Sequence, residues 1–304
     1  MATTAFLFPG QGSQYVGMGA DLVAQTEEGR RLFAEADEVL GFPLSRICLD
    51  GPESELTLTA NTQPALLLVS YTLYQLLGYA PDVAAGHSLG EYSALACAGS
   101  LSFADALLTV HHRGQYMQEA VPVGQGAMAA LIGKSLDEVK QGLADVDGAV
   151  DVANWNSQDQ IVISGEVAAV KAAVERIGAR RSVLLPVSAP FHSRLMAPAE
   201  ERLTADLATT PFADLTYPII NNVAAVEVRT GQAARDGLGP QVSRPVLWME
   251  IMRQLLVDRQ VTRFVEVGPG SVLSGLLRRT AKSLGRSVEV SKVETLADLG
   301  RLSL

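Results

Sequence analysis

Residues 82–98, with the sequence DVAAGHSLGEYSALACA, contain the pattern that decides the fold of this chain. The apolar run at its start predicts a short buried strand that ends at Gly86, and residues 89–98 predict a helix. Between them, residues 86–90 have the form G-x-S-x-G, which in this context makes a tight turn that exposes the serine hydroxyl. Ser88 is therefore the candidate nucleophile.

The predicted helix gives the turn a second property. Its first residues place free backbone N–H groups and the positive end of the helix dipole beside the serine. The N–H of Leu89 is thus a candidate donor to an oxyanion. The alternative is a serine that lies between two loop glycines by chance, and the strand and helix on either side favour the nucleophile.

A serine nucleophile needs a general base, and the chain has four histidines. His87 follows the strand on a strained turn, so we expect its ring to pack elsewhere, while His111 and His112 lie on a predicted helix. His192 lies in a predicted loop, SAPFHS at residues 188–193, at a junction between subdomains. His192 is the candidate base.

An acidic partner for the base is harder to find. In hydrolases with a G-x-S-x-G turn it lies between the serine and the histidine in the chain. A backbone carbonyl could orient the imidazole instead, because none stands out among the aspartates in the middle of the chain, which are Asp145, Asp147, Asp151 and Asp159.

Strands alternate with helices along most of the chain. Residues 4–8 predict a buried strand that ends at Pro-Gly, residues 26–40 an amphipathic helix and residues 64–77 a mostly buried helix. Together with residues 82–98 and a further strand at 262–267, this order indicates an α/β fold with a parallel sheet.

The middle of the chain predicts a different unit. Its order of elements, βαββαβ, is that of a ferredoxin-like subdomain. We expect a large α/β subdomain at 1–124 and 190–304 and a ferredoxin-like small subdomain inserted at 125–189. The predicted elements of the insertion are at 126–133, 135–145, 149–153, 159–164, 166–178 and 182–187.

Composition restricts the class of protein. The 304 residues are 48% hydrophobic, which excludes a disordered chain, and two cysteines exclude a disulfide framework. A net charge of −9 disfavours nucleic acid as a main partner. No membrane span or secretion signal is apparent, and four histidines and two cysteines offer little for a metal site. We expect a cytoplasmic protein without metal, a monomer by default.

Two further positions are candidates for binding. Residues 9–14, PGQGSQ, fail as a dinucleotide-binding pattern because the third glycine is replaced by Tyr15, but such a loop can bring the Gln11 amide close to a reaction centre. Arg113 follows the nucleophile on the next predicted helix, and its guanidinium would suit a substrate with a carboxylate. The alternative for Arg113 is an ordinary exposed arginine.

Taken together, several motifs resemble malonyl-CoA:acyl carrier protein transacylases and the acyltransferase domains of polyketide and fatty acid synthases. The resemblance covers nearly the whole chain in the family's order. It rests on FPGQGSQ at 8–14, GHSLGEY at 86–92, Arg113-Gly114, GAMAA at 126–130, APFHS at 189–193 and VGPG at 267–270.

The resemblance implies a hydrolase-like large subdomain and a role for each candidate residue. Ser88 would form a malonyl ester, and His192 would act first as base and then as acid. The backbone N–H groups of Gln11 and Leu89 would form the oxyanion hole. The main-chain carbonyl of Gln241 would hold the histidine ring, which would account for the missing acidic residue.

The resemblance also implies the substrates. Arg113 would bind the free carboxylate of malonate, and the ring of Phe191 would leave little room for a substituent on C2. The partners would be malonyl-CoA and the phosphopantetheine thiol of an acyl carrier protein, with no permanently bound cofactor. The alternatives are a thioester hydrolase of the same fold, which Arg113 disfavours, and a non-catalytic carrier-binding module. Two basic groups could receive an acidic carrier protein, Arg278, Arg279 and Lys282, or Lys171, Arg176, Arg180 and Arg181.

Overall fold

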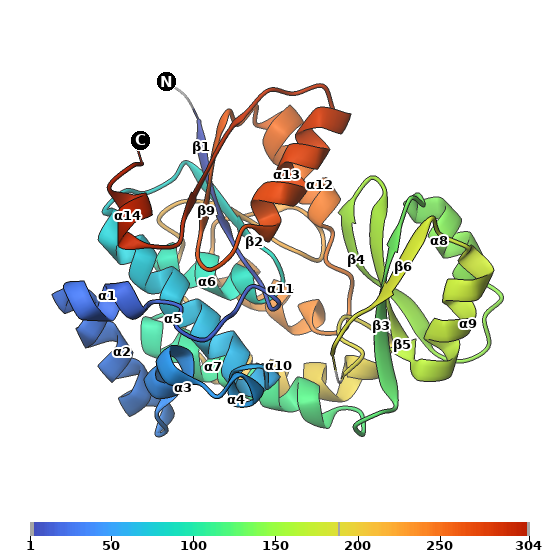
Figure 1. Ribbon diagram of the computed structural model, residues 1–304, viewed down its shortest axis with the longest axis horizontal. Coiled ribbons are helices and arrows are strands. Elements are labelled where there is room, and N and C mark those ends of the chain that lie inside the picture. Colours follow the sequence, from blue (N-terminus) through green and yellow to red (C-terminus); the bar gives the residue numbers. More distant parts are fainter. Residues whose placement is uncertain (1–2, 188, 303–304) are drawn as a thin grey trace.

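The computed structural model describes residues 3–187 and 189–302. Its larger part is a six-stranded sheet in the order β10-β9-β1-β2-β7-β8 (Figure 1). Its neighbouring strands pair in parallel except β8, which is antiparallel to β7. The predicted α/β class is confirmed. The strands are β1 (Thr4–Phe8), β2 (Val83–Gly86), β7 (Ile219–Ile220), β8 (Glu227–Val228), β9 (Arg263–Val267) and β10 (Glu289–Val293).

The central strand β1 is buried on both faces. Phe6 and Phe8 pack into the core beneath one group of helices, while Ala5 and Leu7 pack into the core beneath another. Side chains alternate between the faces of a strand, so a strand covered on both sides must be apolar throughout, as TAFLF is. The first group includes α5 (Thr59–Leu77), α6 (Leu89–Cys97) and α7 (Phe103–Glu119), and the second α12 (Trp248–Arg253) and α13 (Val272–Ser283).

The register of the sheet brings three loops together. Phe8 at the end of β1 is paired with Gly86 at the end of β2, and Leu7 is paired with Glu266 near the end of β9. The segments that follow these strands therefore leave the sheet at the same edge. In open parallel sheets this carboxyl edge is where ligands bind. It is also where residues 9–14 and the G-x-S-x-G turn lie.

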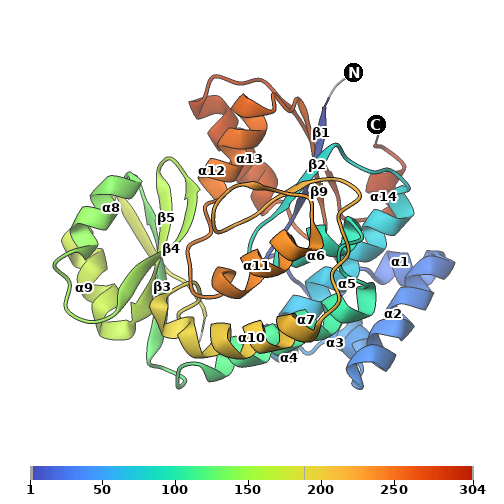
Figure 2. The same cartoon turned by 180° about the vertical axis from the view of Figure 1, so that it is seen from behind.

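A second sheet stands beside the first (Figure 2). Its four antiparallel strands have the order β4-β5-β3-β6, which is the ferredoxin-like arrangement expected for the middle of the chain. One face packs on two helices around Leu131, Ile163 and Val170. The elements are β3 (Gly126–Ile132), α8 (Leu136–Leu143), β4 (Val150–Ser157), β5 (Gln160–Glu166), α9 (Val167–Ile177) and β6 (Arg181–Leu184).

The subdomain boundaries expected at 124/125 and 189/190 stay predictions. Residues 1, 2, 188, 303 and 304 of the predicted ranges lie outside the described residues. The last strand of the small sheet ends at Leu184, three residues before the predicted end, and its last two residues are exposed. The apolar residues at 183–187 thus predicted a longer strand than the one that forms at this exposed edge of the sheet.

Helix α5 differs from the prediction at its start. The prediction began the helix at residue 64, whereas the helix begins at Thr59 and contains Pro64 in its interior. Proline inside a helix leaves the carbonyl four residues earlier without its usual donor. Here that carbonyl, of Ala60, lies 2.8 Å from His111 Nδ1, which can donate to it from α7. A contact distant in sequence therefore permits the longer helix.

Several elements were not predicted, mostly because they are too short to show a period or contain glycine and proline. None of the helices in the described residues is long and apolar enough to cross a membrane. The remaining elements are α1 (Ala20–Gln25), α2 (Glu27–Leu40), α3 (Leu44–Asp50), α4 (Glu53–Leu56), the 3₁₀ turn Arg194–Met196, α10 (Ala197–Thr209), α11 (Gly231–Gln241), the π turn Gln254–Asp258 and α14 (Leu296–Leu299). Only α2 among these was expected, at 26–40.

Candidate active site

The turn between β2 and α6 holds Ser88 in a strained conformation. Its φ of 52° is rarely adopted by residues with a side chain. The glycines around it are required by space, since a Cβ on Gly86 would lie 1.9 Å from the Gly90 carbonyl group. A Cβ on Gly90 would lie 2.0 Å from the carbonyl oxygen of Phe8. The sharp turn and the close approach of β1 therefore depend on both glycines.

A side chain from a distant loop holds both sides of this turn. The Ser88 N–H donates to Asn222 Oδ1 at 2.7 Å, and Asn222 Nδ2 donates to the Gly86 carbonyl at 2.7 Å. Asn222 is fully buried after β7. The sequence analysis did not find it, because an asparagine in an unpatterned segment gives no signal of a contact with residues far away in the chain.

His192 lies within hydrogen-bonding distance of the serine. Its Nε2 is 2.8 Å from Ser88 Oγ, while its Nδ1 is 2.8 Å from the Gln241 carbonyl oxygen and 3.2 Å from that of Arg244. Two carbonyl oxygens can only accept, so Nδ1 carries the proton and Nε2 is free to accept one from the hydroxyl. A side-chain carboxylate is not needed to select this tautomer.

Burial and the nearby Arg113 charge lower the pKa of His192 to about 3. The imidazole is only 4% exposed, and both effects penalise its charged form. His192 is consequently neutral at neutral pH, which is the form able to accept a proton.

Arg113 extends from α7 into the same site and is 1% exposed. Its Nη2 donates to Ser88 Oγ at 3.0 Å and to Gln241 Oε1 at 2.9 Å, and its Nη1 donates to Gln63 Oε1 at 2.8 Å. These partners are neutral, and its Nε has no partner in the described part of the chain. A buried cation held only by neutral groups can bind an incoming anion.

The other histidines are occupied elsewhere, as expected. His87 Nε2 lies 2.9 Å from Asn156 Oδ1, its ring packs on Trp248, and burial lowers its pKa. His112 Nδ1 lies 3.0 Å from Asp206 on α10. Among the contacts of the described residues, His192 has no hydrogen bond with any of the four aspartates in the middle of the chain, and its Nδ1 lies against backbone carbonyl oxygens instead.

A cavity of about 110 Å³ opens in front of the serine, and we call it the Ser88 cavity. Two residues of the predicted oxyanion hole, Gln11 and Leu89, line it, as do Arg113 and Phe191. The structure therefore brings together predicted site residues from four separate segments. Gln241 is not among the lining residues, but it has hydrogen bonds with three of them, Arg113, His192 and Ser88.

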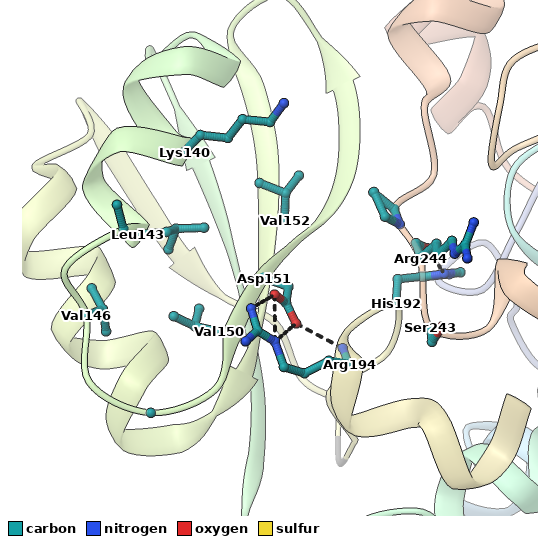
Figure 3. A pocket seen from close by; sticks show the side chains of 13 residues that line it. Lys140, Leu143, Val146, Val150, Asp151, Val152, His192, Arg194, Ser243 and Arg244 are labelled. Carbon is teal, nitrogen blue, oxygen red and sulfur yellow. Dashed lines mark hydrogen bonds and ion pairs between the residues drawn. The ribbon is translucent and has the colours of Figure 1, made fainter.

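A second cavity of about 520 Å³ lies on the other side of His192, between β4 and residues 243–245 (Figure 3). Asp151 lies in it and binds Arg194, accepting from the backbone N–H at 2.9 Å and from the guanidinium. This cavity contains neither Ser88 nor Arg113. In the described ranges, no group of three His, Cys, Asp or Glu side chains could hold a metal ion.

Comparisons with known proteins show the family of the chain. A family model for the acyl transferase domain matches residues 5–303. The malonyl CoA-acyl carrier protein transacylase of Bacillus subtilis is 46% identical over 306 residues, which cover 97% of this chain and 96% of the relative. The crystal structure of an acyl carrier protein S-malonyltransferase from Vibrio cholerae superposes with a TM-score of 0.94 at 43% identity, covering 99% of this chain and all of that one. A malonyl-transacylase solved in complex with its type II polyketide synthase acyl carrier protein gives a TM-score of 0.93 at 39% identity, with 98% of each chain covered.

Proposed function

This chain belongs to the acyl transferase domain family, and we propose that it transfers the malonyl group of malonyl-CoA to the phosphopantetheine thiol of an acyl carrier protein. The observation that carries this proposal is the guanidinium of Arg113, which is buried and lies 3.0 Å from Ser88 Oγ, and whose hydrogen-bond partners among the described residues are all neutral. An acyl group that ends in a carboxylate would find its counter-charge beside the nucleophile.

The first half of the reaction acylates the enzyme. His192 Nε2 takes the proton of Ser88 as Oγ attacks the thioester carbonyl, and the N–H groups of Gln11 and Leu89 bind the resulting oxyanion. The intermediate expels the CoA thiolate, which takes the proton from His192 and leaves as the thiol. The malonyl ester remains on Ser88, with its carboxylate bound by Arg113.

The second half repeats these steps in reverse. His192 takes the proton of the carrier-protein thiol as its sulfur attacks the ester, and the proton returns to Ser88 Oγ as the ester bond breaks. This is a ping-pong mechanism that uses side chains, backbone amides and the two substrates. Throughout, the Gln241 carbonyl keeps the proton on Nδ1.

Phe191 selects for an unsubstituted C2. Its side chain lines the Ser88 cavity directly before the base, and the cavity is small. A methyl group on C2 would have to displace the ring, and steric exclusion of one methyl contributes about 1–3 kcal/mol to discrimination. Methylmalonyl-CoA is therefore expected to be a poorer substrate than malonyl-CoA.

The proposed function requires a surface that binds the carrier protein, and two basic groups are candidates for it. Arg278 of the first basic group is bound to the Val290 carbonyl and Arg279 to Gln160, whereas Arg176 of the second is paired with Asp145. Each of the two surfaces offers positive charge to an acidic carrier. Reversing the charge of Lys282 tests the first surface and reversing that of Lys171 tests the second, and the variant that raises the KM for the carrier protein identifies the docking surface. The cytoplasmic location and the monomeric state stay predictions.

The experiment is a transfer assay with malonyl-CoA and holo acyl carrier protein, in which malonyl-carrier and free malonate are measured together. We expect malonyl-carrier as the main product of the wild type and none from Ser88→Ala. Free malonate as the main product, at a rate independent of the carrier, would instead make the protein a hydrolase.

A further inference from the structure

Glu91 is a buried carboxyl for which the proposed reaction has no use. It lies in the first turn of α6, an otherwise apolar helix, and is only 2% exposed. Its Oε2 accepts two hydrogen bonds, one from Gln241 Nε2 at 2.8 Å and one from the backbone N–H of Asn222 at 3.0 Å. Carboxyl groups are rarely so buried without a specific partner, and these two partners both belong to the candidate active site.

The Gln241 amide has only one orientation that satisfies its neighbours. Its Nε2 donates to Glu91 and, at 3.0 Å, to the Ser88 carbonyl, whereas its Oε1 accepts from Arg113 Nη2 at 2.9 Å. Turning the amide over would point an NH₂ group at the guanidinium and an oxygen at two acceptors. Glu91 is therefore one of the two acceptors that keep Oε1 directed at Arg113.

We propose that Glu91 is a positioning residue for acyl-group selection, which acts by holding the Gln241 amide so that Arg113 is fixed to receive the substrate carboxylate. This inference rests on the proposed function, because it needs Arg113 to bind that carboxylate. Glu91 itself has no hydrogen bond with Ser88 Oγ or His192 among the contacts of the described residues, so it does not act on the reacting atoms.

The arrangement does not require Glu91 to be charged. Burial raises the pKa of this carboxyl to about 7, and the hydrogen bonds from Gln241 and Asn222 and the nearby charge of Arg113 oppose the increase. A proton on Oε1 would leave Oε2 able to accept both of its bonds. The position therefore needs an oxygen that accepts hydrogen bonds, which glutamine supplies and methionine does not.

The test compares kcat/KM for malonyl-CoA and acetyl-CoA with holo carrier protein as acceptor. Acetyl-CoA has no carboxylate for Arg113, so the ratio of the two values measures how well Arg113 is placed. We expect Glu91→Met to lower this ratio about tenfold and Glu91→Gln to restore most of it. The matched control is Glu266→Met, which removes another fully buried carboxyl, one that accepts from the backbone N–H groups of Leu273 and Ser274 and, among the contacts of the described residues, has no hydrogen bond with Ser88, Arg113, His192 or Gln241.

The route through Gln241 is tested by a double variant. Gln241→Met keeps the backbone carbonyl that contacts His192 but removes the amide, and it is expected to lower the same ratio about tenfold. If Glu91 acts through this amide, Glu91→Met combined with Gln241→Met has the ratio of Gln241→Met alone. Should Glu91→Met fail to fold, as judged by circular dichroism, an unchanged ratio in Gln241→Met would still overturn the proposal.

The outcomes separate this inference from the function. A wild type that forms no malonyl-carrier overturns both. A wild type that transfers malonyl, together with an unchanged ratio in Glu91→Met or an equal loss in Glu266→Met, overturns the role of Glu91 alone. Multiplied losses in the double variant would show that Glu91 does not act through Gln241.

Discussion

Ser88 and His192 both have a strained backbone with positive φ, which contacts with neighbouring residues stabilise. Their φ values are 52° and 57°, in the region that L residues seldom occupy. Asn222 holds the turn at Ser88 by two hydrogen bonds, and the imidazole of His192 is held by the Gln241 carbonyl. Strain of this kind persists only where the surroundings fix it, and here it directs both side chains toward each other.

At Arg113 we predict a loss of charge recognition. Arg113→Ala removes the cation that would bind the malonate carboxylate, and a buried charged hydrogen bond is worth about 2–5 kcal/mol. We expect kcat/KM for malonyl-CoA to fall at least about 30-fold, with a smaller fall for acetyl-CoA. Arg202→Ala, which removes an exposed arginine of α10, is the control. Malonyl transfer at the wild-type rate in Arg113→Ala would show that the carboxylate binds elsewhere.

For His192 we predict an effect of pH on stability. Its pKa of about 3 in the folded protein lies below the ordinary value of 6.5, so between these values the unfolded chain binds a proton that the folded protein does not. Stability is therefore lost as pH falls through this window, by roughly 3 kcal/mol at pH 4.5.

His192→Gln removes the imidazole that binds this proton in the unfolded chain. The free energy of unfolding in urea, measured at pH 7 and pH 4.5, should consequently decrease less on acidification in the variant than in the wild type. Glu91 and every other titrating group are present in both proteins and cancel in the comparison. Equal decreases would show that folding does not lower the pKa of His192.

At the scale of elements, the small subdomain is tied to the segment that bears the base. Asp151 on β4 accepts from the backbone N–H of Arg194, two residues after His192. In addition, Asn154 of β4 forms a bridge with Val246, near the carbonyl of Arg244. The position of the imidazole thus depends on β4 as well as on the large sheet.

We predict that this tie contributes to catalysis. Asp151→Ala should lower kcat about three- to tenfold, because an unpaired loop N–H leaves His192 less well placed. The ratio of malonyl-CoA to acetyl-CoA use should stay unchanged, since Arg113 is not involved. Asp145→Ala removes another aspartate–arginine pair of the small subdomain and serves as control. Equal rates for the two variants would contradict a role for the tie.

The elements also explain what the sequence could predict. The strand at 4–8 and the helix after Gly86 were predicted almost to the residue, because local periodicity and glycine define them. The start of α5 was wrong, since a contact between Ala60 and His111 decides it. Helix α11 was not predicted, because three glycines and a proline in its eleven residues obscure any helical period.

At the scale of the whole molecule, the small sheet lies beside the large one (Figure 1), and the Ser88 cavity is lined from both, by Leu89 of α6 and Met128 of β3 for example. The G-x-S-x-G turn predicted Ser88, and local sequence also indicated Gln11, Arg113 and His192 as candidates. The family resemblance added Gln241 and a specific role for each residue, and these roles stay predictions. The contacts of Asn222 and of Glu91 could not be predicted from the sequence, because each joins segments more than 100 residues apart. One local signal for Glu91 was available, a single charge on an apolar helix.

The central claim is that Ser88 carries the malonyl group between two thiols. It is tested most directly by intact-protein mass spectrometry after brief mixing with malonyl-CoA, on the wild type and on Ser88→Ala. We predict one malonyl adduct on the wild type and none on the variant. We also predict that the adduct disappears when holo carrier protein is added, as malonyl-carrier forms. An adduct that persists in Ser88→Ala, or one lost to water at the same rate with and without the carrier, would contradict the account.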